Sequence, residues 1–359
     1  MMEFKVNPDI AASDLRIIEG KYLEDILDQP RALDATLASL DTSQPLTDLA
    51  HDLSEGKFQR IVLTGMGSSF HALHPLNLQL IDHGFTAVMV ETSELIHYKS
   101  RFFDPKTLVV AVSQSGQSVE MVRLAEVNHK RSAVIAVTNT PQSPLVEHAA
   151  AALLTHAGSE FSVSCKTYVT ALMVLKFLGD VLCQRDLQKS RRELKSVAPL
   201  AAEHLRHWRD HVETLADKLR SIRHLFFVGR GGSLAAVGTG ALIVKESDHF
   251  HAEGMSSAAF RHGPFEMLSP DTFVVVFSGD NKTRDLNHRL LTDIQQSGGR
   301  AEFIGDSSSL EPFRLPAHVD SVRPILEILP VQMITIALAA LARREAGKFE
   351  RAAKITTTE

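Results

Sequence analysis

Hydroxyl and amide side chains crowd two places where an apolar run of the sequence ends. The run TLVVAV is followed by SQSGQSVEM, and the run QRIVLTG is followed by MGSSF. Both apolar runs are typical of buried strands, and each polar cluster leads into a helix-like segment. A turn that enters a helix presents unpaired backbone N–H groups, to which serine hydroxyls add further donors. This pattern predicts a site for a phosphate dianion held without a metal, with the residues Ser68, Ser69, Ser113, Gln114, Ser115 and Ser118.

Helix capping and dinucleotide binding are two alternative roles for these clusters. The serines could simply cap the two helices. The glycines could instead belong to a dinucleotide-binding loop, with Glu91 as the ribose ligand. The loop is disfavoured because Phe70 and Leu234 occupy the positions where G-x-G-x-x-G requires its third glycine. We favour the phosphate site because two such turns meet at one edge of the predicted sheet.

A later segment carries groups suited to moving protons. The apolar run ALIV leads to Lys245 and Glu246, and Glu253, His262 and a Gly-Pro pair follow. A charged helix end that runs into a loop with histidine is typical of a segment lining a site. A salt-bridged helix terminus with a histidine in a turn accounts for the same residues equally well.

No metal site or cofactor site is predicted. His204, His207 and His211 recur at i, i+3 and i+7 of one helix. No carboxylate or cysteine completes a zinc spacing around them, so we expect a solvated helix face. Cys165 and Cys183 are expected to pack as small apolar residues, and so few cysteines fit a reducing compartment.

The elements that would position these groups occur twice along the chain. Gly65 and Gly67 match Gly229 and Gly231 at an offset of 229 − 65 = 164, and the strand from Val109 meets an apolar run from Phe273 at the same offset. Strands alternate with helices in both halves, which predicts parallel sheets covered on both faces. The expected fold class is α/β, with two doubly wound parallel-sheet domains in tandem. We place a helical arm at 1–45, the phosphate-binding domain at 46–196, the Glu/His domain at 197–345 and a tail at 346–359.

Composition excludes several classes of protein. The chain has 359 residues, a length that suggests about two domains. Its net charge of −5 argues against nucleic acid as a partner. The stretch ILEILPVQMITIALAALA contains Glu327, Pro330 and Gln332, so a buried helix is expected and a membrane partner is not. The N-terminus lacks the apolar core of a signal peptide, and we expect a cytoplasmic protein.

Six ordered motifs together resemble the sugar isomerase (SIS) family, and especially the isomerase half of glutamine–fructose-6-phosphate aminotransferases. They are TGMGSSFHA, SQSGQSVEM, AGSEFSVSCKTYVT, GRGGSLAAVGTGALIVKE, HAEGMSSAAFRHGP and RAAKITTTE. The resemblance runs in order from about residue 46 to the end of the chain.

The resemblance implies a role for each candidate residue. The serines and Gln114 named above would hold the 6-phosphate of a sugar, which would be lined by Gly67, Val163 and Ser164. Glu246 would move a proton between C1 and C2, and Lys354 would lie in a tail that closes over the sugar. His262 would assist ring opening in the partner subunit's site, which implies a homodimer with shared active sites. The resemblance implies no cofactor.

The chain also departs from the family pattern. The aminotransferases begin with a catalytic cysteine and a glutaminase domain, neither of which is present here, so no glutaminase activity is expected. Ile243 replaces the lysine three residues before the catalytic carboxylate, and Ala259 replaces the glutamate three residues before the histidine. Both changes indicate an altered site chemistry.

Three functions are consistent with these features. We favour a deaminase/isomerase that converts glucosamine 6-phosphate and water to fructose 6-phosphate and ammonia. A fructosamine-6-phosphate deglycase is the first alternative. The second is a sugar-phosphate sensor without catalysis, which is disfavoured because Glu246, His262 and Lys354 are all retained and because residues 1–45 are too short and acidic for a DNA-binding domain.

Overall fold

The computed structural model describes residues 17–317, 320–351 and 353–356. These residues form two compact units, and the chain passes between them several times. The first-sheet unit contains Arg31–Ser159, Lys166–Ala198 and the tail residues 353–356. The second-sheet unit contains the residues up to Pro30, Glu160–Cys165 and Pro199–Arg351. The expected N-terminal arm is helical from α1 (Lys21–Leu27) onward, and its residues 1–16 lie outside the described part.

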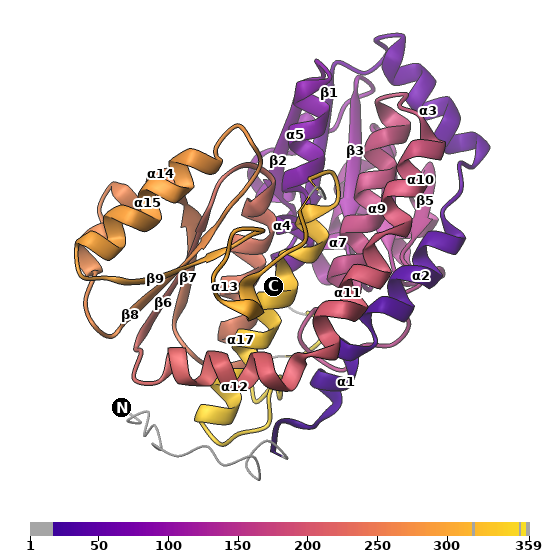
Figure 1. The fold of residues 1–359 in the computed structure, drawn as a ribbon. Coiled ribbons are helices and arrows are strands. Elements are labelled where there is room, and N and C mark those ends of the chain that lie inside the picture. Colours follow the sequence, from indigo (N-terminus) through magenta and orange to yellow (C-terminus); the bar gives the residue numbers. More distant parts are fainter. Residues whose placement is uncertain (1–16, 318–319, 352, 357–359) are drawn as a thin grey trace. The chain divides into compact units, whose positions relative to one another are not determined.

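The first-sheet unit is built on five parallel strands (Figure 1). Their order across the sheet is β2 (Ala87–Glu91), β1 (Arg60–Gly65), β3 (Thr107–Val112), β4 (Ala133–Thr138) and β5 (Ala151–Leu154). All six residues of β3 are buried. A continuous apolar strand of this kind is typical of a parallel sheet with helices on both faces.

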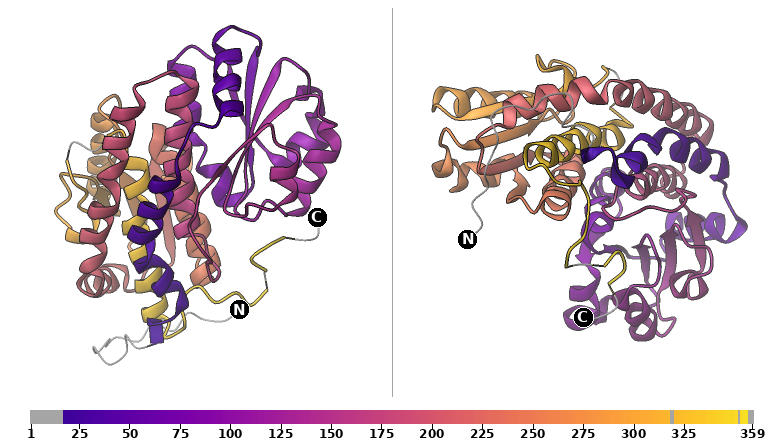
Figure 2. Two further views of the ribbon diagram at one scale, coloured as in Figure 1. Left: turned by 90° about the vertical axis from the view of Figure 1, so that its right-hand side faces the viewer. Right: turned by 90° about the horizontal axis from the view of Figure 1, so that it is seen from below.

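Helices cover both faces of this sheet, as the views in Figure 2 show. On one face, α9 (Lys166–Leu182) packs against α3 (Gln44–Ser54) and α5 (His74–Asp82). On the other face, α7 (Val119–Asn128) packs against α6 (Thr92–Tyr98) and α8 (Pro144–Glu147) over a core that includes Val62, Val109 and Leu124. The remaining helices of this unit are α2 (Gln29–Ser39), which begins at the unit boundary, α4 (Gly67–His71), η2 (Ser100–Phe102) and α10 (Leu187–Lys195).

The second-sheet unit is built on four parallel strands in the order β7 (Ala252–Ser256), β6 (His224–Gly229), β8 (Thr272–Phe277) and β9 (Arg300–Ile304). One face is covered by α13 (Leu234–Asp248), which packs against α17 (Ile328–Leu341); α12 (Trp208–Leu219) also packs against α17. The opposite face is covered by α14 (Ser257–Arg261) and α15 (Arg284–Gln296), whose Phe260, Leu290 and Ile294 lie in one core with Phe226 and Val274. The shorter helices are η3 (Gly231–Ser233), η4 (Pro264–Met267), η5 (Glu311–Phe313) and α16 (Arg323–Leu326), and α11 (Val197–Arg206) begins at the unit boundary.

The predicted fold class is confirmed, and the internal repeat is confirmed with one correction. The first strands match at the predicted offset, because β1 begins at Arg60 and β6 at His224. The second pair does not, because Ile61 pairs with Leu108 whereas its counterpart Leu225 pairs with Phe273. The offset there is 273 − 108 = 165, so one residue has been added between the strands of the second copy.

The long apolar stretch near the end of the chain is a core helix, as predicted. Among the described residues, Arg323–Leu341 is the one helical stretch long and apolar enough to cross a membrane. However, 94% of its apolar window is buried inside the protein.

Candidate functional site

The two polar clusters of the first-sheet unit lie at the point where its strand order reverses. β1 and β3 are neighbours, and the last residue of β1, Gly65, pairs with the last residue of β3, Val112. The turns that follow therefore leave the same edge of the sheet side by side, where doubly wound folds bind their ligands. Gly67 and Gly116 allow both turns, since their φ angles are +51° and +62°.

The turn after β3 is held by its own serines. Ser113 Oγ accepts a hydrogen bond from Gly116 N at 3.1 Å, and Ser115 Oγ accepts one from Gln117 N at 3.2 Å. A hydroxyl that accepts one bond still has its hydrogen to donate. The turn is also closely packed, because a Cβ on Gly116 would lie 2.3 Å from Ser143 Oγ. These contacts fix the turn, and both serines are buried, Ser113 being 8% and Ser115 6% exposed.

The remaining serines do not cap helices, which removes the capping alternative for them. Ser118 occupies the N-cap position of α7, but its hydroxyl makes no capping hydrogen bond. Ser68 and Ser69 lie inside α4, whose N-cap residue is Met66. All three side chains are partly exposed, so their hydroxyls are accessible at the edge of the sheet.

The C-terminal tail reaches the same turn. Val119 N, the first amide of α7, donates to the carbonyl of Thr356 at 3.2 Å. This bond places the tail beside Ser118, and the candidate Lys354 lies two residues earlier in that tail. The role expected for Lys354, in a tail that closes over the sugar, stays a prediction.

The other candidates belong to the second-sheet unit. Glu246 lies in the last turn of α13, and the adjacent Ser247 carbonyl accepts a hydrogen bond from Gly347 N at 3.4 Å. The Gly347 carbonyl in turn accepts a hydrogen bond from Ser162 Oγ. The segment Glu160–Cys165, which carries Val163 and Ser164, therefore lies beside the helix end that carries Glu246. His262 is exposed at the end of α14.

Two buried groups near this helix end were not foreseen. Asp248 is 1% exposed and accepts a hydrogen bond from Ser247 Oγ at 2.6 Å. Burial raises the pKa of the Asp248 carboxyl well above its usual range, and the Ser247 hydrogen bond opposes this rise. Burial likewise raises the pKa of Tyr22, whose ring packs against Gly347. In the sequence, only its position in the motif KESD, two residues after Glu246, indicated Asp248, and nothing indicated Tyr22.

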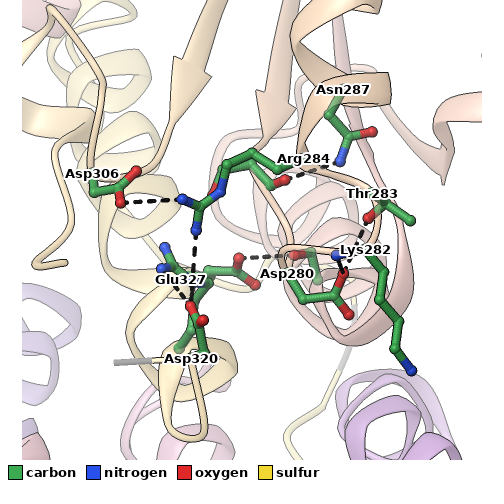
Figure 3. A network of polar contacts seen from close by, with 11 residues as sticks. Asp280, Lys282, Thr283, Arg284, Asn287, Asp306, Asp320 and Glu327 are labelled. Carbon is green, nitrogen blue, oxygen red and sulfur yellow. Dashed lines mark hydrogen bonds and ion pairs between the residues drawn. The ribbon is translucent and has the colours of Figure 1, made fainter. Parts of the chain in front are cut away.

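The corresponding edge of the second sheet carries ion pairs beside its serines, Ser233 and Ser278. In Figure 3 the Arg284 guanidinium lies between two carboxylates, 3.5 Å from Asp306 and 3.9 Å from Asp320. Asp320 also pairs with Arg323 at 2.8 Å. Asp280 accepts hydrogen bonds within its own turn, from Lys282 N at 3.0 Å and from Thr283 Oγ1. The two repeats therefore have the same backbone plan and different side-chain chemistry.

Glu327 is the buried carboxyl of this edge. It is 0% exposed and accepts a hydrogen bond from Ser233 Oγ at 2.8 Å. Burial raises its pKa to about 7, while the Ser233 hydrogen bond and Arg323 lower it and Asp280 raises it further.

The histidines of α11 and α12 differ from the expected solvated face. His207 is half exposed, but His211 is 4% exposed, and burial lowers the pKa of His204 to about 3. The rings of His204 and His211 pack 4.6 Å apart because their helices enclose them. Within the described ranges, no group of three or more His, Cys, Asp or Glu residues is arranged to hold a metal ion.

We predict that Glu327→Gln stabilises the protein at high pH more than at low pH. The folded-state pKa of about 7 exceeds the 4.5 that is usual for a glutamate, so the wild type loses stability as pH rises between these values. The glutamine variant has no such loss, and the difference reaches about 3 kcal/mol at pH 8. Urea unfolding of both proteins between pH 5 and pH 8 measures it. The control Glu311→Gln removes an exposed carboxylate, and its difference in unfolding free energy from the wild type should not grow with pH. If the unfolding free energies of the wild type and Glu327→Gln changed in parallel with pH, the prediction would be contradicted.

Comparison with known proteins supports the interpretation of both sheets. The SIS domain family matches twice, at residues 55–179 and 218–341. A glutamine–fructose-6-phosphate aminotransferase from Pyrococcus horikoshii is 30% identical over 356 residues, which are 95% of this chain and 58% of that protein. The chain therefore spans little more than half the length of this curated relative.

Solved structures share the fold over nine-tenths of the chain or more. The C-terminal domain of glucosamine-fructose-6-phosphate aminotransferase from Francisella tularensis has a TM-score of 0.78 at 23% identity, covering 90% of this chain and 96% of that one. A glucosamine-6-phosphate deaminase from Thermotoga maritima has a TM-score of 0.71 at 18% identity, covering 94% of this chain and all of that one. With both sheets matched by the family model, this chain belongs to the SIS domain family and contains two SIS domains.

Proposed function

We propose that the protein is a phosphosugar isomerase that acts as a deaminase on an amino-sugar 6-phosphate. The observation that carries this proposal is the pair of turns at the ends of β1 and β3, where Ser68, Ser69 and Ser118 are partly exposed and Ser118 makes no capping bond. Hydroxyls and helix-terminal amides suit a phosphate ester. The family membership and the deaminase among the similar folds agree with this substrate class.

The proposed reaction uses one carboxylate for both proton transfers. His262 assists opening of the ring, which frees the C1 aldehyde of glucosamine 6-phosphate. Glu246 removes the proton from C2 and returns it to C1, which leaves an imine at C2. Water adds to this imine, and ammonia leaves to give fructose 6-phosphate. Every proton that Glu246 takes from carbon is returned to carbon, so the step needs no redox cofactor.

The loss of the family lysine agrees with an altered chemistry. Ile243 occupies its position and is completely buried. A lysine ammonium at this depth would require a paired charge. The carboxyls of Glu246 and the buried Asp248 are thus the acidic groups at this helix end, and Tyr22 packs close to them.

We predict that Glu246→Gln abolishes most turnover of glucosamine 6-phosphate. Loss of a general acid–base group lowers kcat by about 100- to 10,000-fold. The assay follows ammonia and fructose 6-phosphate together. The control Glu253→Gln changes a partly exposed glutamate of β7 and should retain wild-type kcat.

The same assay separates the alternatives. Turnover of fructosamine 6-phosphates alone would favour a deglycase. Binding of sugar phosphates with no turnover of either class by the wild type would favour a sensor and contradict the proposed reaction.

We predict that Ser118→Ala raises KM for the sugar phosphate about 10-fold, the effect of losing one charge-assisted hydrogen bond. Its stability should be unchanged, because the hydroxyl caps nothing. Asp186→Ala is the matched control, since this side chain does cap α10 through the amides of Gln188 and Lys189. It should lose about 1 kcal/mol of stability and keep its KM. A stability loss in Ser118→Ala with an unchanged KM would show that Ser118 serves only the helix.

We predict a homodimer in which His262 serves the partner subunit's site. The observation that favours this is the exposure of His262 in the chain. Glu246→Gln and His262→Asn should each be inactive alone, and a mixture re-formed from both should recover about a quarter of wild-type activity, because half of the dimers are mixed and each has one intact site. The measurement is the ammonia assay before and after subunit exchange. No recovery in a mixture shown to contain mixed dimers would contradict a shared site.

A further inference from the structure

The second sheet repeats the geometry of the phosphate turns and has no role in the function proposed above. β6 and β8 are neighbours at the point where the strand order reverses. Left-handed glycines occur in these turns as well, because Gly231, the counterpart of Gly67, and Gly279, two residues after β8, have φ angles of +61° and +69°. The carboxyl ends of these two strands therefore form a second edge of the kind at which doubly wound sheets bind ligands.

Polar atoms without partners gather at this edge. Three of their side chains are deeply buried: Ser278 and Glu327 are 0% exposed and Arg323 is 3% exposed. Among the described residues, no hydrogen-bond partner is found for Arg230 Nε, Ser278 Oγ, Arg284 Nε, Arg323 Nη1 and Glu327 Oε2. Buried polar atoms are nearly always paired, so a cluster of unpaired ones indicates an occupant.

Direct contacts show that these residues share one place. Ser233, from the turn after β6, donates to Glu327 at 2.8 Å, and a Cβ on Gly232 would touch Pro324 at 3.4 Å. Glu327 also interacts electrostatically with Asp280, from the turn after β8. In Figure 3 the carboxyl of Glu327 faces the turn that carries Asp280.

The third strand end joins the same cluster. A Cβ on Gly305, just after β9, would lie 2.7 Å from Ser278 Cβ. Arg284 pairs with Asp306 at this strand end and with Asp320 before α16. The unpaired atoms thus come from the ends of β6 and β8, the start of α15 and the two ends of α16, and the end of β9 packs beside them.

The charges at this edge balance one another. The guanidiniums of Arg230, Arg284 and Arg323 and the ammonium of Lys282 stand with the carboxyls of Asp280, Asp306, Asp320 and Glu327. With Glu327 ionised, the two sets of charges are equal in number. A phosphate or another anion would find no excess positive charge here to bind it. A ligand that carries no charge does not need such an excess.

We propose that the carboxyl edge of the second sheet binds an uncharged polyhydroxylated molecule, a free sugar or sugar alcohol. Each hydroxyl both accepts and donates a hydrogen bond. Its oxygen accepts from the unpaired N–H groups of the arginines, and its hydrogen is donated to Glu327 Oε2 or Ser278 Oγ. No charged group or covalent step is needed.

The test is ligand-observed NMR of the full-length protein with sorbitol, glucose, inorganic phosphate and glucose 6-phosphate. We expect saturation transfer to sorbitol or glucose that inorganic phosphate does not compete away. Arg230→Met, which removes one unpaired donor from a partly exposed residue, should weaken this binding about 10-fold or more. Ser118→Ala, in the other unit, should leave it unchanged, so failure here is distinguishable from failure of the phosphate site.

A second variant guards against misfolding. Ser278→Ala deletes an unpaired buried hydroxyl, so it should keep the melting temperature of the wild type and still weaken polyol binding. Three results would overturn the proposal. They are no saturation transfer to either neutral ligand, equal binding by wild type and both variants, or a high-resolution crystal soaked in sorbitol with ordered water only at the five atoms.

Discussion

The parallel pairing of β1 with β3 is the constraint on which the candidate site depends. Because Gly65 pairs with Val112, the next residues of both strands must turn at the same edge of the sheet. A turn at such an edge leaves backbone N–H groups that the sheet no longer pairs. The serines satisfy part of this need from within, through Ser113 and Ser115, and the tail satisfies the first amide of α7. Ser68, Ser69 and Ser118 stay partly exposed at this edge, and hydroxyl donors of this kind are suited to an anion.

The second copy has the same backbone plan as the first. The strand pairing therefore determines where a ligand site can lie, and it does not determine which side chains line that site. Both sheets have left-handed glycines after their two central strands. In the first copy these turns hold a cluster of hydroxyls, whereas in the second Ser233 and Ser278 stand beside Asp280 and the ion pairs of Arg284. Two sequences with one fold can therefore present different surfaces to a ligand at the same edge. The addition of one residue between β6 and β8 marks where the second copy diverged.

Much of this architecture could be predicted from local sequence patterns. The continuous apolar runs identified β3 and β8, and the polar clusters identified the turns. Both could be predicted because each pattern is contained in a few consecutive residues. Contacts between distant segments could not be predicted in this way. The loop Glu160–Cys165 joins the second-sheet unit through Asp25, which accepts a hydrogen bond from Phe161 N at 2.6 Å, and through Gly347. The burial of His211 was missed for the same reason, since a helical spacing shows which residues share a face and not what covers it.

The end of α13 illustrates how one substitution changes what a helix end can do. Residues 243 and 246 are three apart and therefore lie on neighbouring positions of the helix surface. With isoleucine at 243 that surface is apolar and completely buried up to the last turn. Glu246 is thus the first ionisable group on this side of the helix, and Asp248 follows it in a site where burial favours the protonated carboxyl. With isoleucine in place of the family's lysine, an accessible carboxylate and a buried acid are the ionisable groups that this helix end offers to the proton transfer proposed above.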